Sequence, residues 1–313
     1  MSRKPLLWVK SYPYPPEVSA LTDLGAQDVG MEIFLGSNVD KNEECLRICR
    51  DSYPRFGVEL FCYQDEEKGR SDIVYDPCSL NDDIRRLSRS YLFSILELAV
   101  KYGASHLQLD GNDGYVSSVD SFNQRNTLPT IQQKKDLLLE IRARFGDIPI
   151  YFENTIPIDD HAVNFSFSLT GHRLSDFWRE GLPLEYDIAH HAIALDVYSR
   201  ASEFGFPLTF EEEELGRQVR KSGITAVFLD ELQRFPSIYF THLGNAMRFS
   251  LGVKSDVIPD NPDEALLDLD RVLPLLMEKS LNITPEVQDK NYVKRPNLRS
   301  WIARLQEYSI SSL

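Results

Sequence analysis

Eight short β-rich runs alternate with longer amphipathic stretches along this chain. The stretches between the runs, such as residues 42–52, 83–102, 131–145 and 263–279, carry apolar residues at three- and four-residue intervals, as amphipathic helices do. Strands that alternate with helices are typical of repeated βα units and a parallel sheet. We therefore predict an α/β protein built as a single (β/α)8 TIM barrel. The predicted strands are Leu6 to Lys10, Gly30 to Leu35, Gly57 to Tyr63, His106 to Asp110, Ile148 to Glu153, Leu184 to Asp187, Ile238 to His242 and Ile283 to Val287.

The length of 313 residues suits one barrel of about 250 residues with insertions, although it would also suit two smaller domains. No internal repeat, low-complexity tract or Pro/Gly/Ser-rich linker divides the chain, so one domain over residues 1–313 is the simpler prediction. Gly111 to Pro129 and the roughly fifty residues between the sixth and seventh strands exceed an ordinary connection. We expect extended loops after the fourth and sixth strands. A C-terminal extension, from about 291 to 313, is expected to dock on a partner subunit or fold back under the barrel.

The composition excludes several classes of partner. A formal net charge of −14, without any run of Lys or Arg, disfavours nucleic acid. No apolar stretch reaches the roughly 18 residues that span a bilayer, so no membrane partner is expected. Cys45, Cys49, Cys62 and Cys78 form no Cys-x-x-Cys pair, which predicts a reduced, cytoplasmic protein. The oligomeric state stays open, and a homo-oligomer is one possibility.

Four predicted strands in the second half of the chain end in potential metal ligands: Glu153, Asp187, His242 and Glu286. Because all strands of a parallel barrel open their carboxyl ends onto one face, these four side chains can converge on one ion. Three carboxylates and one imidazole suit Mn, Mg or Co better than structural zinc, which favours thiolates and imidazoles. The alternative for each carboxylate is that it caps the next helix or pairs with a nearby lysine.

These strand ends, with the Asp187-Ile-Ala-His190 motif, resemble the xylose isomerase-like superfamily of TIM barrels. That group includes sugar isomerases, ketose 3-epimerases of the tagatose epimerase type and apurinic endonucleases. The resemblance spans Gly30-Met-Glu-Ile-Phe, Ala104-Ser-His-Leu-Gln-Leu-Asp-Gly, Tyr151-Phe-Glu-Asn-Thr and Thr284-Pro-Glu. It is closest to the epimerase type, in which a Glu, an Asp, a His and a Glu hold one divalent ion in that strand order. The resemblance therefore implies that Glu153, Asp187, His242 and Glu286 are the metal ligands here, and that His190 and Arg248 bind substrate.

The same resemblance implies a divalent-metal-dependent sugar isomerase or epimerase. The sequence has no Gly-rich phosphate loop and no basic cluster, so we expect an unphosphorylated sugar or polyol as its substrate. One Mn, Mg or Co ion would stabilise an enediolate, while Glu153 and Glu286 remove and return a proton. Transfer between the two faces of one carbon gives epimerisation, and transfer to the neighbouring carbon on one face interconverts aldoses and ketoses. The alternatives are a metal-dependent hydrolase or lyase, including an endonuclease-like one, and a noncatalytic binding protein on the same barrel.

The chain departs from the endonuclease branch at three places. Those enzymes carry extra histidines for three zinc ions at the ends of early strands and in a late Asp-x-His motif. The corresponding places here hold Asp76, Asp110 and the stretch Ser255-Asp256-Val-Ile258, with no histidine. The departure makes cleavage at abasic sites the weaker prediction. Asp76 and Asp110 precede Pro77 and Gly111, so they either cap turns or face the sugar, and the sequence leaves that choice open.

Overall fold

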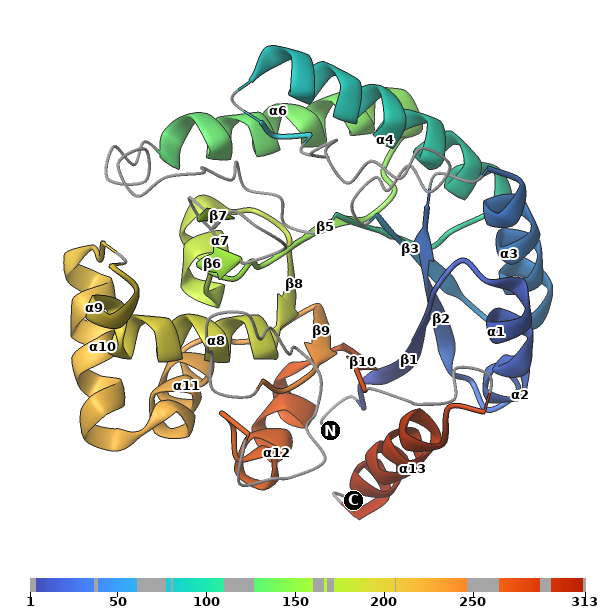
Figure 1. Ribbon diagram of the computed structural model, residues 1–313. Helices are drawn as coiled ribbons and strands as arrows, with labels where there is room; N and C mark the ends of the chain where they lie inside the picture. Colours follow the sequence, from blue (N-terminus) through green and yellow to red (C-terminus); the bar gives the residue numbers. More distant parts are fainter. Residues whose placement is uncertain are drawn as a thin grey trace.

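Eight parallel strands close into a barrel, surrounded by helices (Figure 1), in the order β1-β10-β9-β8-β5-β4-β3-β2. The computed structural model describes residues 4–36, 39–60, 77–79, 81–109, 127–159, 166–167, 172–205, 207–246, 265–287 and 294–311. The architecture confirms the predicted TIM barrel, and each observed strand overlaps its predicted run. The barrel strands are β1 (Leu6–Ser11), β2 (Gly30–Leu35), β3 (Phe56–Leu60), β4 (Leu107–Leu109), β5 (Ile150–Glu153), β8 (Leu184–Asp187), β9 (Phe240–Leu243) and β10 (Asn282–Pro285).

The helices follow the strands along the chain, and a small antiparallel pair, β6 (Ile158–Asp159) and β7 (Ser166–Phe167), lies between β5 and α7. Asn81 caps the start of α4, and Gly103 ends it with a φ of 85°, as a left-handed terminator does. The helices are α1 (Pro15–Ala20), α2 (Thr22–Gly25), α3 (Val39–Ser52), α4 (Asp82–Tyr102), α6 (Thr127–Phe145), α7 (Leu174–Glu180), α8 (Ile188–Ser199), α9 (Ala201–Phe204), α10 (Phe210–Ser222), α11 (Ile224–Gln233), α12 (Leu269–Lys279) and α13 (Pro296–Ser311).

The segment between β8 and β9 is largely helical, so the prediction of an extended loop after the sixth strand is wrong. It folds into α8, α9, α10 and α11. Thr209 and Glu212 form a reciprocal capping box that starts α10, and Gly223, with a φ of 85°, separates α10 from α11. Local capping signals therefore divide a long connection into short helices. The loop predicted after the fourth strand falls on residues 110–126, outside the described part of the chain.

Side chains alternate along the barrel strands between the surrounding helices and the barrel interior. The outward positions, such as Val9, Ile33 and Val58, are apolar and fully buried under the helices. The inward positions are mostly polar, and nearly all are buried as well. They include Lys10, Glu32, Glu59, Gln108, Glu153, Glu185, Asp187, His242 and Thr284. The apolar core thus lies outside the barrel, and the interior is left for polar chemistry.

Three rings, those of Trp8, His106 and Phe240, form an aromatic floor below this polar interior. The ring of His106 lies 4.9 Å from that of Trp8 and 4.7 Å from that of Phe240, measured between centroids. Each of the three rings comes two positions before a polar inward residue of its own strand. Residues two positions apart on a strand point to the same face, so the rings also face the barrel interior. The floor therefore closes the barrel at the end opposite the carboxyl ends of the strands, and His106 belongs to the buried interior.

Gly57 leaves the space that the His106 ring fills. A Cβ at this position would lie 2.1 Å from the ring, so Gly57→Ala is expected to overpack the floor and destabilise the protein by about 1–3 kcal/mol. Chemical denaturation measures this loss. Gly36→Ala is the matched control, because its Cβ would lie 3.8 Å from its nearest neighbour, Pro13, and we expect a change within about 0.5 kcal/mol. Equal losses for the two variants would contradict the overpacking argument.

The described part of the predicted C-terminal extension forms α13, which packs against β1 and β10. Arg295 pairs with Glu17 and Arg299 pairs with Asp23, each at 2.6 Å, so α13 is fastened to the first two helices of the chain. The last helix therefore covers the seam where the first and last strands meet.

Among the described residues, no helix has both the length and the apolarity needed to cross a membrane.

Candidate metal centre

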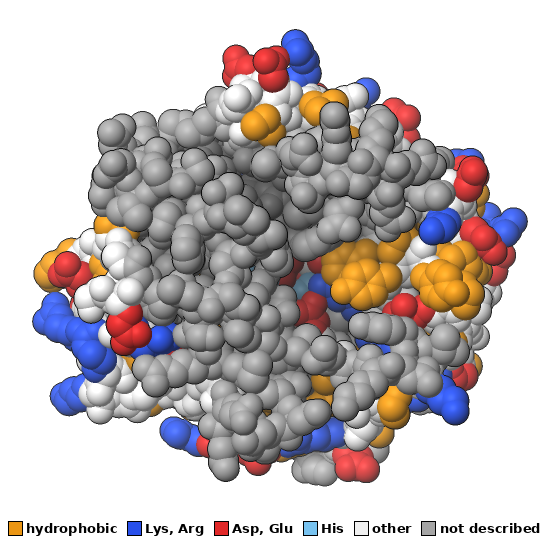
Figure 2. All heavy atoms as spheres, viewed as in Figure 1, with side chains coloured by type: hydrophobic (Ala, Val, Ile, Leu, Met, Phe, Trp, Pro, Cys, Tyr) orange, Lys and Arg blue, Asp and Glu red, His pale blue; other side chains and the backbone are white. Residues whose placement is uncertain are grey.

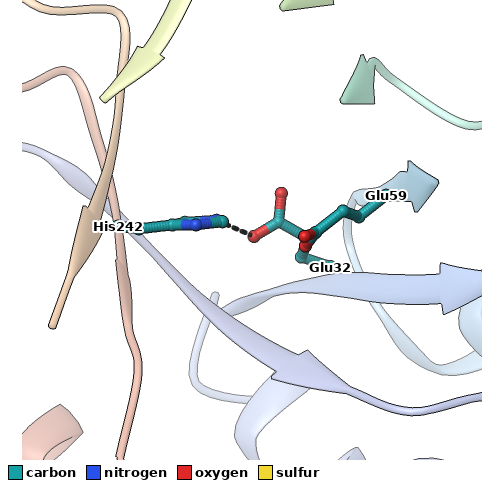
Figure 3. Close-up of side chains that lie close together, drawn as sticks. All are labelled: Glu32, Glu59 and His242. Atoms are coloured by element: carbon teal, nitrogen blue, oxygen red, sulfur yellow. Dashed lines mark hydrogen bonds and ion pairs between the residues drawn. The ribbon is translucent and has the colours of Figure 1, made fainter. Parts of the chain in front are cut away.

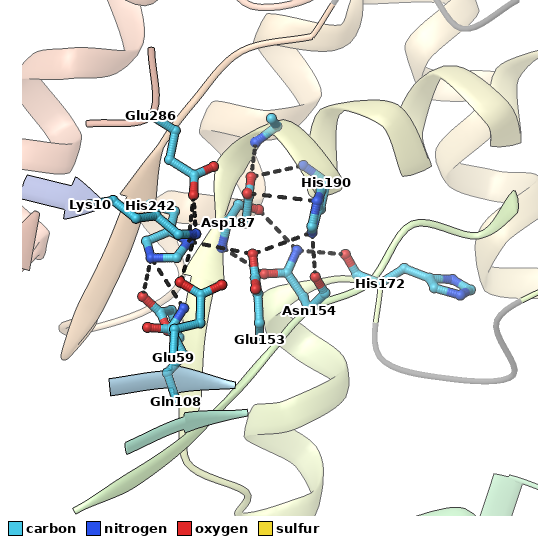
Figure 4. Close-up of polar contacts among 12 residues, drawn as sticks. Lys10, Glu59, Gln108, Glu153, Asn154, His172, Asp187, His190, His242 and Glu286 are labelled. Carbon is cyan, nitrogen blue, oxygen red and sulfur yellow. Dashed lines mark hydrogen bonds and ion pairs between the residues drawn. The ribbon is translucent and has the colours of Figure 1, made fainter. Parts of the chain in front are cut away.

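The four predicted ligands, Glu153, Asp187, His242 and Glu286, converge at the carboxyl ends of β5, β8, β9 and β10 (Figure 4). Nδ1 of His242 lies 3.4 Å from Oε1 of Glu153 and 3.3 Å from Oε1 of Glu286. Asp187 joins them, since its ligand oxygen lies within 4.8 Å of those of His242 and Glu286. Residues separated by more than 130 positions in sequence thus surround one small volume.

The distances around His242 suit ligands of a divalent ion. Asp187 forms one close group with His242 and Glu286, and another with Glu153 and His190. Two ligand atoms about 2.1 Å from an ion, at an angle of roughly 90–110°, lie roughly 3.0–3.4 Å apart. The contacts from His242 Nδ1 to the two glutamates agree with that spacing. Oδ2 of Asp187 is buried and has no hydrogen-bond partner, and such an orphaned oxygen is unfavourable unless a cation or a proton meets it. The donor set and its geometry therefore suit a bound cation.

Asp187 uses its two carboxylate oxygens differently. Oδ1 accepts hydrogen bonds from the backbone N–H groups of Ala189 at 2.6 Å and His190 at 3.0 Å, which caps α8. Oδ2 lies 3.7 Å from Nε2 of His190. Helix capping, the alternative that the sequence left open for this residue, thus occupies one oxygen and leaves the other facing the site.

Asn154, the residue after Glu153, orients both Asp187 and His190. Its side chain accepts from the Asp187 N–H at 2.7 Å and donates to the Asp187 carbonyl at 2.9 Å. Its own carbonyl oxygen lies 2.7 Å from Nδ1 of His190, so that nitrogen carries a proton and Nε2 is directed toward Asp187. His191 lies elsewhere, with Nε2 at 2.8 Å from Glu231. His190, and not its neighbour, therefore lines the site.

Lys10 also belongs to the site, although the strand-end pattern does not reveal it. Its Nζ lies 2.8 Å from Oε2 of Glu59 and 3.5 Å from Nδ1 of His242, and it forms an ion pair with Oε1 of Glu286. Burial lowers the pKa of Lys10. The charges of Glu286, Glu59 and Glu153 raise it by more, so the net pKa lies well above its ordinary value. The ammonium group therefore stays charged at neutral pH.

A second layer of carboxylates lies behind His242, next to the other ring nitrogen. Nε2 is 2.9 Å from Oε2 of Glu32 and 2.6 Å from Oε1 of Glu185, and Glu59 lies beside Glu32 (Figure 3). Carboxylates at Nε2 hold a proton on that nitrogen and direct Nδ1 toward Glu153 and Glu286. A carboxylate behind a histidine in this way is the usual support of a metal-binding imidazole.

The described interior holds more negative than positive charge. Six carboxylates surround His242 and Lys10: Glu32, Glu59, Glu153, Glu185, Asp187 and Glu286. Burial raises the pKa of Glu59 and of Glu185 well above the usual range, and neighbouring carboxylates raise it further. Such an excess of buried carboxylates needs protons or a cation for balance.

The surroundings shift the pKa values of Asp187 and Glu153 in opposite directions. Burial, together with the charges of Glu286 and Glu153, raises the pKa of Asp187 to about 8, against the opposing charge of His190. Burial acts in the same direction on Glu153, but its hydrogen bond to His242 and the charge of that ring lower its pKa to about 2. Burial lowers the pKa of His242, while the charges of the surrounding carboxylates raise it to well above its ordinary value. Glu153 is thus a carboxylate at neutral pH, and a cation would replace protons held by Asp187 and His242.

Glu32→Gln is expected to weaken metal binding about 10- to 100-fold, because it removes a charged partner that orients the His242 ring. Isothermal titration of Mn²⁺ into metal-free protein measures the dissociation constant. Glu231→Gln is the matched control, since it alters an equivalent carboxylate–histidine contact at His191, and it should leave the constant unchanged. Equal affinity of the Glu32 variant and the natural protein would show that the second layer does not support the site.

Two stacked aromatic rings stand beside the opening of the site. The rings of Tyr12 and Phe34 lie 5.1 Å apart and nearly parallel, and Nζ of Lys10 lies 4.5 Å above the Phe34 ring. Tyr12 is 55% exposed. Figure 2 shows a hollow near the centre of this face, with acidic and basic side chains inside it and apolar side chains at its edge. The described opening therefore combines charge with a flat apolar surface.

Four other residues that the sequence analysis considered cannot be placed. Arg248, predicted to bind substrate, and Asp76, Asp110 and Asp256 all lie outside the described residues. Of the four cysteines, Cys45, Cys49 and Cys78 are buried, and Cys62 also lies outside the described part.

No protein-family model and no curated protein sequence matches the chain. Among solved structures, the chain is similar to the TTHB071 protein from Thermus thermophilus, in a structure obtained by soaking with ZnCl2. The two are 14% identical, with a TM-score of 0.54 over 97% of this chain and 98% of the other. The likeness shows that the same fold extends over nearly the whole of both chains.

Proposed function

We propose that the protein is a divalent-metal-dependent isomerase or epimerase that acts on an unphosphorylated sugar or polyol. The observation that carries the proposal is the arrangement of Glu153, Asp187 and Glu286 around Nδ1 of His242. It lies at the carboxyl ends of barrel strands, where the catalytic sites of TIM barrels are found. The orphaned Oδ2 of Asp187 supports a cation at this place.

The four residues would hold a single Mn, Mg or Co ion, because three carboxylates and one imidazole form a hard, oxygen-rich donor set. When bound, the ion would supply positive charge that stabilises an enediolate oxygen. Glu32 and Glu185 would keep the His242 ring in place, and Asn154 would keep Asp187 in place.

Glu153 and Glu286 would move the substrate proton. They follow strands three apart in the barrel, β5 and β10, so they can approach a bound sugar from different sides. His242 lowers the pKa of Glu153 against the effect of burial, so Glu153 is deprotonated, the form that a proton-accepting group needs. Glu286 is 14% exposed at its side chain and could return a proton from the open side of the site. His190 would bind a substrate oxygen through Nε2, because Nδ1 is directed at Asn154.

The opening suits a sugar-like ligand. The exposed ring of Tyr12, stacked on Phe34, offers a flat apolar surface next to a polar interior, and an exposed aromatic surface beside a cleft is typical of a ligand-binding groove. The sequence contains no Gly-rich phosphate loop and no basic cluster, which favours an unphosphorylated substrate. The buried thiols of Cys45 and Cys49, which form no disulfide, support a reducing, cytoplasmic setting.

Two measurements test the proposal. Elemental analysis should find one divalent ion per chain, whereas three zinc ions per chain would favour the endonuclease-like alternative. Protein reconstituted with Mn, Mg or Co should then exchange a carbon-bound proton of a sugar with solvent deuterium, across a panel of ketoses and aldoses. Absence of exchange with every sugar and every metal would sink the proposed activity, and a bound sugar without exchange would indicate a binding protein.

A further inference from the structure

We propose that Lys10 is a built-in competitor of the metal ion. Its ammonium group pairs with Oε1 of Glu286 and lies close to Nδ1 of His242, the two atoms that a divalent ion would bind. Binding of the ion would displace the ammonium group from Glu286. This inference rests on the metal centre of the proposed function.

The geometry of the barrel brings the competing groups together. Lys10 is an inward residue of β1, and β1 pairs with β10, the strand that Glu286 follows. The oxygen of Glu286 that pairs with Lys10 is the same Oε1 that lies 3.3 Å from Nδ1 of His242 (Figure 4). Lys10 is 11% exposed at its side chain, so solvent screens its charge little. The ammonium group and the ion would therefore meet at the same carboxylate oxygen, where their positive charges repel each other.

A displaced Lys10 has other partners at hand. Its Nζ already lies 2.8 Å from Glu59, which is buried and is not one of the four predicted ligands. The face of the Phe34 ring, 4.5 Å from Nζ, also stabilises a cation. The ammonium group can thus release Glu286 without being left alone in the interior.

A Lys10 that competes with the ion and a Lys10 that supports it predict opposite changes in metal affinity when Lys10 is removed. If Lys10 only oriented Glu286 for the ion, removing it would weaken metal binding. If Lys10 competes, removing it frees Glu286 and takes a positive charge away from the ion, so the ion binds more tightly. Without Lys10, the carboxyl groups of Glu59 and Glu286 would also lack a positively charged partner in the metal-free variant. A bound ion should therefore raise the melting temperature of the variant more than that of the natural protein, because metal binding and folding are linked.

The test is Lys10→Met, titrated with Mn²⁺ in its metal-free form at fixed pH. We expect a dissociation constant at least about tenfold lower than that of the natural protein. Lys10→Arg keeps the charge and should stay closer to the natural value. Lys101→Met is the matched control, because Lys101 also pairs with a carboxylate, Glu43 at 2.8 Å, but on the surface with 61% exposure. It should not change the affinity.

An unchanged or weaker affinity of Lys10→Met would overturn the competition and leave the metal centre standing. A natural protein that binds no divalent ion would overturn both. If metal-free Lys10→Met does not fold, the variant is prepared with Mn²⁺ and its loss of metal to excess EDTA is timed. Slower loss than in the natural protein supports the competition, and equal or faster loss overturns it.

Discussion

Glu153→Gln is expected to reduce deuterium exchange into the substrate by about 10²- to 10⁴-fold, the usual contribution of a positioned acid–base group. An amide cannot accept the proton that the Glu153 carboxylate, with a pKa of about 2, would take from carbon. Exchange is followed by the loss of a carbon-bound proton signal in D2O, with a sugar from the panel that the natural protein turns over and with saturating Mn²⁺.

The metal content of the Glu153 variant separates its two proposed roles. If Glu153→Gln still binds Mn²⁺ when it is saturated, the loss of exchange reports the missing base; if it does not, the loss reports the missing ligand. Glu140→Gln is the control, because Glu140 forms only a partly exposed ion pair with Arg89 on the outer helices. A metal-loaded Glu153 variant with full exchange would remove this residue from the proposed chemistry.

Asp187 allows ligand and helix cap to be separated in one pair of variants. Asp187→Asn keeps a side-chain oxygen for the N–H groups of Ala189 and His190 but loses the charge of the ligand. Asp187→Ala loses both. We expect both variants to weaken Mn²⁺ binding by more than about a hundredfold, beyond the range seen for residues that only support a ligand.

Stability should distinguish the same two variants. Asp187→Ala is expected to unfold about 1 kcal/mol more easily than Asp187→Asn, because it leaves the first turn of α8 uncapped. Titration calorimetry and denaturant unfolding of the metal-free proteins give the two quantities. Tight Mn²⁺ binding by Asp187→Asn would mean that the carboxylate serves only the helix.

The fold was predictable because its signals are local. Short β-rich runs and helical periodicity each extend over a few residues, and the strand ends at Glu153 and Asp187 agree with the prediction to the residue. The segment after β8 was harder, since four short helices with their own caps, such as Thr209 at α10, are easily taken for a loop with one helix. Its length alone did not determine its structure.

The convergence of side chains in the candidate site was predictable only at the strand ends. Lys10, Glu32 and Glu185 needed knowledge of which strand face turns inward and of how neighbouring strands align. A usable signal existed, because Glu185 precedes Asp187 by two residues and so shares its face of β8. A charged residue two positions before a strand-end ligand is therefore expected to point into the same site. The pairing of Lys10 with Glu286 has no local signal at all, since the two residues come from opposite ends of the chain.

The seam between β1 and β10 affects how the protein is made. Lys10 and Glu286 are 276 residues apart, and the same seam pairs Leu6 with Asn282. During synthesis, β1 has no neighbour on one side until β10 has left the ribosome, and contacts of such long sequence separation form slowly. The barrel therefore cannot close, and the candidate site cannot form, before β10 is made. Until then the unpaired edge of β1 is open to pairing with other chains.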